Sequence, residues 1–215
     1  QRLQVANRVL RHNLRNDMNV VHGLAERIES DEADDPAAVA ARIQSKVDGV
    51  VETSEKVREM TRIEPSSGDE AEPVDVGTVA EEVVTQFDTE DATVERSLSR
   101  SRAAITDEAA LTTALGNLLE NAVEHNDCDE PWVRLSVEED EGTVRLRVDD
   151  DGPGIPEEER EVLRREAETP LKHSQGLGLW LASWSARAAG GELTIESTGP
   201  DGTTVRIELP AADRN

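Results

Sequence analysis

The stretch TVRLRVDDDGPGIP, residues 143–156, joins a run of alternating apolar and polar residues to three aspartates and a Gly-Pro-Gly segment. The alternation has a period of two and predicts a strand. The two glycines that follow allow the backbone to turn tightly and to approach a ligand. A carboxylate at the end of such a strand can accept a hydrogen bond from the exocyclic amine of a purine. One aspartate is therefore a candidate for contacting a base rather than a phosphate, because two anions repel each other.

Strand and helix patterns on both sides of this stretch predict an α+β fold. WVRLSVEE, residues 132–139, alternates in the same way and is joined to the stretch by a turn near Gly142. Mixed strands and helices with adjacent hairpins indicate a sheet that is covered by helices on one face. The other predicted elements are VDVGTVAEEVVTQF (residues 74–87, a short strand that continues as a helix), ALTTALGNLLENAVEH (110–125, a helix), LGLWLASWSARAAG (177–190, a helix) and ELTIES with TTVRIELP (192–197 and 203–210, a hairpin around TGPDG).

The N-terminal part of the chain has the pattern of a helical hairpin. From Leu3 to Ile28, mostly apolar residues recur at alternating steps of four and three, which places them along one narrow stripe of a helix that we call the seam. A second apolar face runs from Val39 to Met60. Pro36 stands where the second helix can begin. Each helix has one narrow apolar stripe, and two such helices bury too little surface alone. We therefore predict a homodimer in which two hairpins form a four-helix bundle.

A segment rich in Pro, Ser, Gly and acidic residues, EPSSGDEAEP (residues 64–73), separates the hairpin from the mixed part and has the composition of a hinge. The predicted domains are the helical hairpin at 1–64, a linker at 65–73 and the mixed domain at 74–215. The chain opens within a helical pattern at Gln1, so we expect an upstream part, such as a sensor or a membrane anchor.

The composition of the 215 residues is strongly acidic. Asp and Glu number 47 against 23 Lys and Arg, and the net charge of -24 excludes general attraction to nucleic acid or to anionic lipid. Acid excess with only three lysines is expected of a halophilic protein, although a merely acidic soluble protein has the same composition. The lone Cys128 cannot form an internal disulfide, and no apolar run approaches the ~20 residues that span a bilayer. We therefore expect a cytoplasmic chain without a membrane segment.

His12 is the first candidate for chemistry, because its helix position turns it away from the apolar seam. Arg8, Arg11 and Arg15 flank it, and such a collar can accept an incoming phosphoryl group. Asn16 shares its face one turn later. An exposed histidine is more often an ordinary surface residue, and the arginines can equally form ion pairs with neighbouring acids. Both interpretations stay open at this point.

Two further motifs suit a magnesium nucleotide. Asn117 and Asn121 in NLLENA lie four residues apart, so they share a helical face and can offer neutral oxygens to a hard cation and donors to phosphate. Gly176 and Gly178 immediately precede a helix, where backbone N–H groups can hold phosphate. Each motif alone is weak evidence. Their order along the chain with DDGPGI between them makes a chance coincidence very unlikely.

With these motifs the chain resembles the histidine kinases of two-component signalling, and closely the haloarchaeal members with an HNLRN box around the phosphoacceptor. The resemblance extends from His12 to the last strand. It implies a dimerisation and phosphotransfer hairpin, followed by an ATP-binding α/β sandwich of the Bergerat type shared with gyrase, MutL and heat-shock ATPases. It further implies an enzyme that uses ATP and Mg²⁺, phosphorylates itself, and passes the phosphoryl group to an aspartate in the receiver domain of a response regulator.

The resemblance also implies roles for single residues. His12 would be the phosphoacceptor, Asn16 would position water for dephosphorylation of the regulator, and Asn121 would hold Mg²⁺. Asp150 matches the aspartate that reads adenine, and the aspartates on either side of it are expected to face water. The implied ATP-binding residues are Asn117, Asn121, Asp150, Gly152, Gly154, Lys172, Gly176, Leu177 and Gly178.

Three departures from the family pattern keep rival functions open. Asn13 stands where the family usually has an acid and cannot take the imidazole proton, so either autophosphorylation is slow or Asp17 or water takes it. Residues 156–175 lack the aromatic box of the ATP lid, and Ser174 stands where a glycine is common. The first rival is an ATP-binding dimeric scaffold or a pseudokinase with phosphatase function. The second, a nucleotide-hydrolysing switch, is disfavoured because Asn117 replaces the glutamate of those hydrolases.

Overall fold

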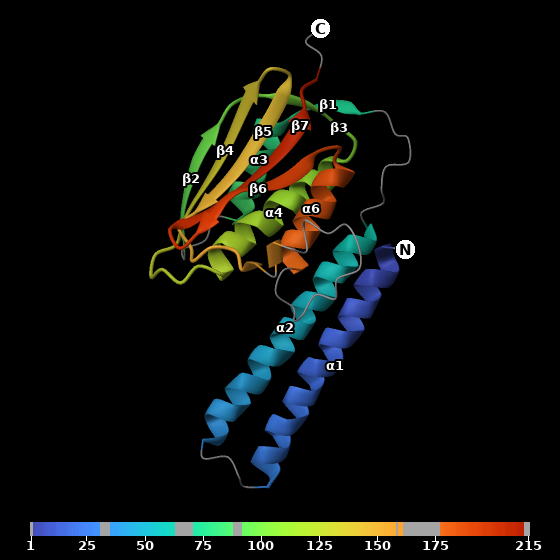
Figure 1. The fold of residues 1–215 in the computed structure, drawn as a ribbon, viewed down its shortest axis with the longest axis vertical. Coiled ribbons are helices and arrows are strands. Elements are labelled where there is room, and N and C mark those ends of the chain that lie inside the picture. Colours follow the sequence, from blue (N-terminus) through green and yellow to red (C-terminus); the bar gives the residue numbers. More distant parts are fainter. Residues whose placement is uncertain are drawn as a thin grey trace. The chain divides into compact units, whose positions relative to one another are not determined.

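The computed structural model describes residues 2–30, 35–62, 71–87, 92–157, 159–160 and 177–212, without the side chains of residues 2–13, 52, 57 and 59–62. These residues form two compact units. One unit contains the N-terminal helical hairpin and the other contains a five-stranded sheet (Figure 1). No helix in the described ranges is both long enough and apolar enough to cross a membrane.

The hairpin consists of α1 (Arg2–Glu29) and α2 (Pro36–Arg62). Asp35 caps the start of α2, where its carboxylate accepts hydrogen bonds from two backbone N–H groups. Across the two helices, Lys46 Nζ donates to Asp17 Oδ1 at 3.3 Å. This ion pair fixes the level at which the antiparallel helices lie against each other.

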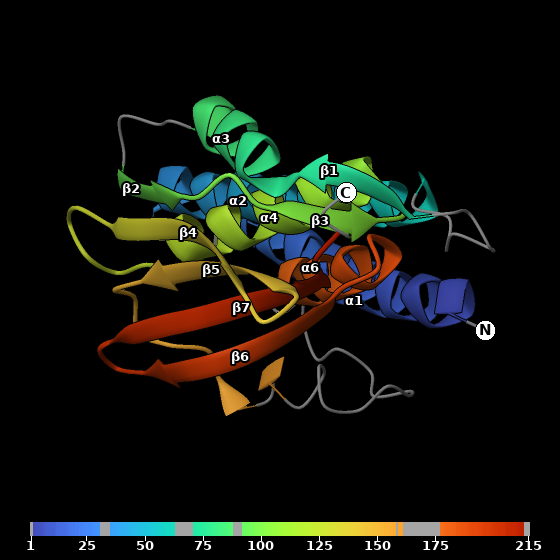
Figure 2. The same cartoon turned by 90° about the horizontal axis from the view of Figure 1, so that it is seen from above.

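The second unit is a sheet with α3, α4 and α6 on one face (Figures 1 and 2). Its elements are β1 (Glu72–Asp75), α3 (Val76–Phe87), β2 (Thr93–Leu98), β3 (Arg102–Ile105), α4 (Glu108–Glu124), β4 (Trp132–Asp140), β5 (Thr143–Asp150), α6 (Leu177–Ala188), β6 (Glu192–Gly199) and β7 (Gly202–Pro210).

The strand order of the large sheet is β2-β4-β5-β7-β6, with β2 parallel to β4 and the other neighbours antiparallel. Strands β1 and β3 form a separate antiparallel pair. In β5 the buried Val144, Leu146 and Val148 alternate with half-buried polar residues. Because the period is two, Asp150 ends β5 on the helix-covered side, whereas Asp149 points to the open face.

Helix α4 begins at a defined cap and carries much of the core. The Asp107 carboxylate accepts a hydrogen bond from Ala110 N at 3.0 Å, which satisfies one free donor of the first turn. Leu111, Leu115 and Leu119 are fully buried on the face of α4 that is turned toward the sheet. Their burial determines which face of α4 packs against the sheet.

The α+β fold predicted from the sequence is confirmed, including the two hairpins and the single helical layer. The turn near Gly142 is present, with Glu141 and Gly142 at positive φ of 47° and 82°. Strands β2 and β3 were not predicted. In β2 only Val94 and Leu98 are half-buried, so this edge strand has almost no apolar alternation.

Candidate functional site

Asn117 and Asn121 place two incompletely paired carboxamides on α4. Asn117 is 5% exposed, and its Nδ2 donates to Thr113 O at 2.9 Å while its buried Oδ1 has no partner among the described residues. The buried Nδ2 of Asn121 likewise has no partner there. Buried polar atoms without partners are costly and mark places where a ligand completes the bonding. One unpaired acceptor and one unpaired donor on the same helix fit a cation and a phosphate.

Gly178 brings the amino end of α6 against Asn121. A Cβ added at Gly178 would lie 2.5 Å from Asn121 Oδ1 and 3.0 Å from its Nδ2, so only glycine permits this approach. The first backbone N–H groups of a helix have no partners within the helix and favour anions. The structure therefore places one member of each of two predicted motifs, Asn121 and Gly178, next to each other.

We expect Gly178→Ala to weaken binding of Mg-ATP by about tenfold or more, because the new methyl group displaces the Asn121 carboxamide. The thermal midpoint should change little, because the higher helix propensity of alanine, up to ~1 kcal/mol, offsets the cost of displacing the Asn121 side chain. Gly116→Ala in α4 is the matched control, because a Cβ there meets nothing within 4 Å. Calorimetric titrations and thermal melts of both variants check this. Unchanged affinity in Gly178→Ala would contradict the assignment of this site.

Asp150 offers one free carboxylate oxygen on the helix side. Its Oδ1 accepts hydrogen bonds from Gly152 N at 2.9 Å and from Thr203 N at 3.2 Å. Its Oδ2 accepts none from the described residues, so it can accept from a ligand. The two backbone bonds fix the direction in which that oxygen points.

Several glycine residues lie close to the end of β5 and allow the backbone segments there to approach one another. A Cβ at Gly152 would lie 3.1 Å from Asp150 Oδ1, and one at Gly202, whose φ is +124°, would overlap with the carbonyl oxygen of Asp150. Gly154 has a φ of +88° and lies so close to Gly199 that a Cβ would be 2.6 Å from its carbonyl oxygen. The tight backbone conformation that glycine was predicted to provide is present at Gly154, and the close approach there is to Gly199.

Burial raises the pKa of the Asp150 carboxyl above 3.8, its ordinary value, despite the two backbone hydrogen bonds that lower it. A carboxyl with a higher pKa in the folded chain binds its proton preferentially there. The free energy of unfolding therefore falls as pH rises from the ordinary pKa through the raised one.

The variant Asp150→Asn lacks this titration while its amide oxygen can still accept both backbone bonds. We expect it to be more stable than the original chain above the raised pKa, and the difference to disappear as the pH falls below 3.8. Thermal midpoints of both chains over a pH series measure the difference. Parallel curves would show that burial of this charge costs no stability.

The aspartates on either side of Asp150 are half-buried and keep part of their surface exposed, and each also makes hydrogen bonds within the chain. Asp149 Oδ1 accepts a hydrogen bond from Thr204 Oγ1 at 2.7 Å on the open face of the sheet. Asp151 Oδ1 accepts from Asn126 Nδ2 at 2.7 Å and from a backbone N–H of β4 at 3.0 Å. The strand pairing and the loop after α4 bring these partners close, and neither is visible in the local sequence.

Two threonines that complete the site were also missed. Thr198 Oγ1 accepts from Ile155 N at 2.7 Å and lies 3.2 Å from Thr203 Oγ1, while Thr203 N donates to Asp150. Both flank the turn between β6 and β7. Their only sequence signal is their place beside TGPDG at residues 198–202.

The remaining predicted residues fall in the hairpin or outside the described residues. His12 lies in α1, but its side chain is outside the described part, whereas Asn16 is exposed on the same helix. Leu177 is buried at the start of α6. Lys172 and Gly176 lie outside the described residues, so their predicted contacts with ATP stay predictions.

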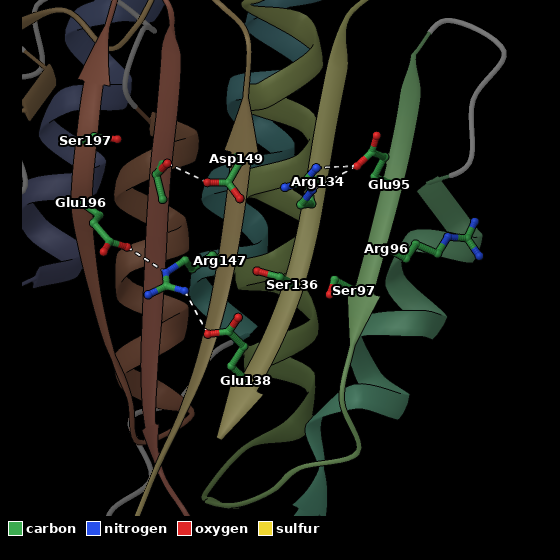
Figure 3. Close-up of a pocket in the computed structure, with 11 residues that line it drawn as sticks. Glu95, Arg96, Ser97, Arg134, Ser136, Glu138, Arg147, Asp149, Glu196 and Ser197 are labelled. Atoms are coloured by element: carbon green, nitrogen blue, oxygen red, sulfur yellow. Dashed lines mark hydrogen bonds and ion pairs between the residues drawn. The ribbon is translucent and has the colours of Figure 1, made fainter. Parts of the chain in front are cut away.

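A hollow of about 670 Å³ lies on the open face of the sheet, on the other side from Asp150 (Figure 3). Arg134 donates to Glu95 at 2.8 Å, and Arg147 pairs with Glu196 at 2.9 Å and with Glu138 at 3.2 Å. The hollow is lined by Glu95, Arg96, Ser97, Arg134, Ser136, Glu138, Arg147, Asp149, Glu196, Ser197 and Thr204.

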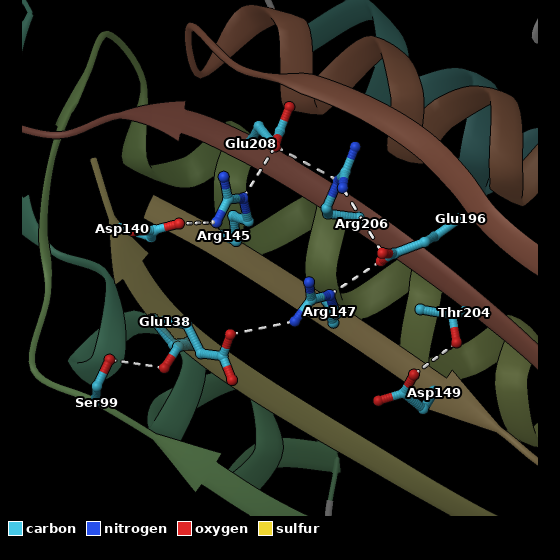
Figure 4. A network of polar contacts seen from close by, with 11 residues as sticks. Ser99, Glu138, Asp140, Arg145, Arg147, Asp149, Glu196, Thr204, Arg206 and Glu208 are labelled. Carbon is cyan, nitrogen blue, oxygen red and sulfur yellow. Dashed lines mark hydrogen bonds and ion pairs between the residues drawn. The ribbon is translucent and has the colours of Figure 1, made fainter. Parts of the chain in front are cut away.

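The charges of this open face pair largely with one another across four strands (Figure 4). Consecutive ion pairs link Asp140, Arg145, Glu208, Arg206, Glu196, Arg147 and Glu138, with separations from 2.9 to 3.7 Å. Such a network ties the strands together, although the buried Arg206 Nε meets Glu208 at 3.6 Å and has no hydrogen-bond partner among the described residues. The polar groups that lack partners and fit a nucleotide lie instead on the helix-covered side.

Comparisons with known proteins agree with this geometry. The family model described as histidine kinase-, DNA gyrase B-, and HSP90-like ATPase matches residues 106–213. Sensor protein kinase CarS of Pseudomonas aeruginosa is 45% identical over 106 residues, which cover 48% of this chain and 23% of CarS. The chain thus spans only about a quarter of the length of that relative.

Two solved structures are similar in fold. The mycobacterial sensor histidine kinase MprB is 26% identical with a TM-score of 0.54, and the match covers 66% of this chain and 100% of that one. Histidine kinase ThkA, in a complex with response regulator protein TrrA, is 22% identical with a TM-score of 0.66 and matches 94% of this chain and 59% of that one. The second match shows likeness of fold alone.

Proposed function

We propose that this chain, which belongs to the family of histidine kinase-, DNA gyrase B- and HSP90-like ATPases, is the phosphotransfer core of a two-component sensor histidine kinase. In this function it binds Mg-ATP, receives the γ-phosphoryl group on His12, and donates it to an aspartate of a response regulator. The relation to CarS and MprB supports the kinase, and the ThkA complex supports the type of partner.

The observation that carries the proposal is the joining of Asn117, Asn121 and the start of α6 at Gly178. Asn121, whose buried Nδ2 has no partner among the described residues, lies against Gly178 in the first turn of α6, and Asn117 with its unpaired Oδ1 lies one turn earlier on α4. Asp150 adds a carboxylate oxygen on the same side of the sheet. A phosphate chain needs donors and a cation, and a purine amine needs an acceptor. The site provides each kind of group.

The Mg²⁺ site is a proposal on the same residues. No three His, Cys, Asp or Glu side chains of the described part cluster so as to hold a metal ion. Mg²⁺ commonly binds through one or two protein oxygens together with substrate phosphates. The Asn121 carboxamide, after a half-turn about χ2, and the Asn117 Oδ1 are the oxygens suited to this role. When bound, Mg²⁺ would neutralise charge on the transferred group.

For phosphotransfer, an imidazole nitrogen of His12 attacks the γ-phosphorus, the bond to the ADP oxygen breaks, and the ring proton leaves to a base. Asn13 carries an amide, which cannot take that proton. Asp17 pairs with Lys46 at 3.3 Å, which holds its carboxylate in the contact between the helices. Water is therefore the acceptor that we favour. The exposed Asn16 remains available to position water for the reverse, phosphatase, reaction.

A homodimer is part of the proposal because the hairpin leaves apolar residues uncovered. Leu14 and Met18 on α1 and Val47 and Val51 on α2 are 38%, 39%, 39% and 50% exposed. Each pair is one helical turn apart, and the Asp17–Lys46 ion pair places both pairs at about the same level of the hairpin. Large exposed apolar residues of this kind mark an interface. A second copy of the hairpin would cover them in a four-helix bundle.

We expect Val51→Glu to convert the dimer to a monomer, because it buries a charge at the centre of the proposed interface. Asn19→Glu, which adds the same charge to an exposed position of α1, is the control and should remain dimeric. Light scattering over a concentration series measures the mass of each chain. If the Val51→Glu chain remains dimeric, the dimer interface does not include Val51 and lies elsewhere.

The test of the function is incubation with γ-labelled ATP and Mg²⁺ in dilute and in concentrated KCl, because the net charge of -24 favours folding at high salt. The expected product carries label that is stable in alkali and lost in acid, as a phosphoramidate is. A receiver domain added afterwards should remove the label. A folded chain that binds ATP but takes no label would support instead the scaffold or phosphatase function, which Asn13 favours.

A further inference from the structure

Hydrogen bonds tie the segment after β5 to the segment after α4. Asp151 Oδ1 accepts from Asn126 Nδ2 at 2.7 Å and from Trp132 N at 3.0 Å, and Asp151 N donates to Trp132 O at 3.3 Å. Asn126 uses the other end of its carboxamide to accept from Cys128 N at 2.9 Å. We call the Asp151–Asn126 side-chain bond with these backbone partners the clamp.

The clamp lies between the two halves of the candidate nucleotide site. Asp151 directly follows Asp150, and Asn126 follows α4 by two residues and Asn121 by five. A Cβ at Gly152 would lie 3.7 Å from the Cα of Asn126, so the two segments are in contact. The clamp therefore joins the segment that follows Asp150, the proposed base acceptor, directly to the segment that follows α4, the helix of Asn117 and Asn121.

We infer that Asp151 and Asn126 are positioning residues that fix the free oxygen of Asp150 relative to Asn121, and so set the affinity for the adenine nucleotide. This inference rests on the proposed function of Asp150. The backbone between Asp150 and Asp151 is a single peptide unit, so movement of one carboxylate moves the other. Errors of about 1 Å in the placement of a site can cost on the order of 100-fold in function.

The chemistry of the clamp suits a fixed contact. The hydrogen bond from the Trp132 N–H, and next the one from Asn126, lowers the pKa of the Asp151 carboxyl below its usual value. Hydrogen bonds to a charged acceptor are shorter and stronger than neutral ones. Asp149, two residues earlier on the open face of the sheet, makes a bond of the same length to Thr204. That second bond provides a matched comparison.

The test is a polarity swap. Asn126→Asp sets two carboxylates against each other, so we expect it to weaken Mg-ATP binding by about tenfold or more. Asp151→Asn alone keeps an amide oxygen that can accept from both Asn126 Nδ2 and Trp132 N, so we expect it to bind within about threefold of the original chain. The double variant Asn126→Asp with Asp151→Asn again has a donor facing an acceptor. The amide oxygen at position 151 can accept from Trp132 N, and the carboxylate at position 126 can accept from Cys128 N. We expect it to bind within about threefold of the original chain.

Calorimetric titration with ATP, and circular dichroism to confirm folding, measure these outcomes at a temperature where every variant is folded. Thr204→Val, which removes the matched bond to Asp149, should keep the original affinity. Rescue by the double variant separates positioning from a general loss of stability, because loss of stability alone would leave the affinity of the folded chain unchanged. An Asn126→Asp chain that binds like the original, or a double variant that does not recover, would overturn the inference. If the original chain binds no ATP, the proposed function fails rather than the clamp.

Discussion

We expect the variant His12→Gln to take up no label from γ-labelled ATP, while its affinity for Mg-ATP should stay within about twofold of the original. Glutamine has no nucleophilic ring nitrogen, so no phosphoramidate can form at this position. The affinity should persist because every residue that we assign to nucleotide binding belongs to a different part of the chain from α1. Labelling followed by electrophoresis, with calorimetry on the same samples, measures both quantities.

His22→Gln is the matched control for this experiment. His22 lies on the same helix ten residues later, is exposed, and pairs with Glu26 at 3.5 Å. Its replacement should leave labelling intact. Label that persists in His12→Gln but is lost in His22→Gln would move the acceptor to His22, and label that persists in both would place it outside α1.

We expect the variant Asp150→Asn to lose about 10- to 100-fold in affinity for Mg-ATP, which corresponds to the ~1.5–3 kcal/mol of a hydrogen bond to a charged group. The amide can still accept from Gly152 N and Thr203 N, so the local backbone should keep its course. What is lost is the charge that Oδ2 presents to the purine amine. Calorimetric titration measures the change.

Asp149→Asn provides the control for this loss, because the same substitution one residue earlier falls on the open face of the sheet beside Thr204. We expect it to bind ATP as the original chain does. Equal affinity in Asp150→Asn and the original chain would remove Asp150 from the site. Equal losses in both variants would indicate a general effect of charge and not a contact with the base.

Much of the fold was predictable because the local periodicity of apolar residues indicates which elements form. Alternation in β5 and the helical spacing of Asn117 and Asn121 are properties of neighbouring residues, and both elements are present in the structure. The edge strand β2 was missed for the same reason. It is short and mostly exposed, and it exists through its parallel pairing with β4, some forty residues away.

The candidate site was predictable to the level of motifs but not of contacts. The sequence identified Asp150 through a family resemblance and treated its two neighbours alike. Asp151 finds its partner in Asn126, 25 residues earlier, and Asp149 finds its partner in Thr204, 55 residues later. Nothing in DDDGPGIP distinguishes the three aspartates in this way.

The sequence by itself predicted the helices and most of the strands, and it proposed the domain boundary and the glycines and asparagines of the candidate site. Only the tertiary structure decided which face each aspartate serves, because hydrogen bonds between distant segments depend on how strands pair and where loops return. Asp150 shows this most directly, since the N–H that orients its carboxylate belongs to Thr203 on the neighbouring strand. Local patterns fix which groups a chain offers, and packing between distant elements fixes which of them meet.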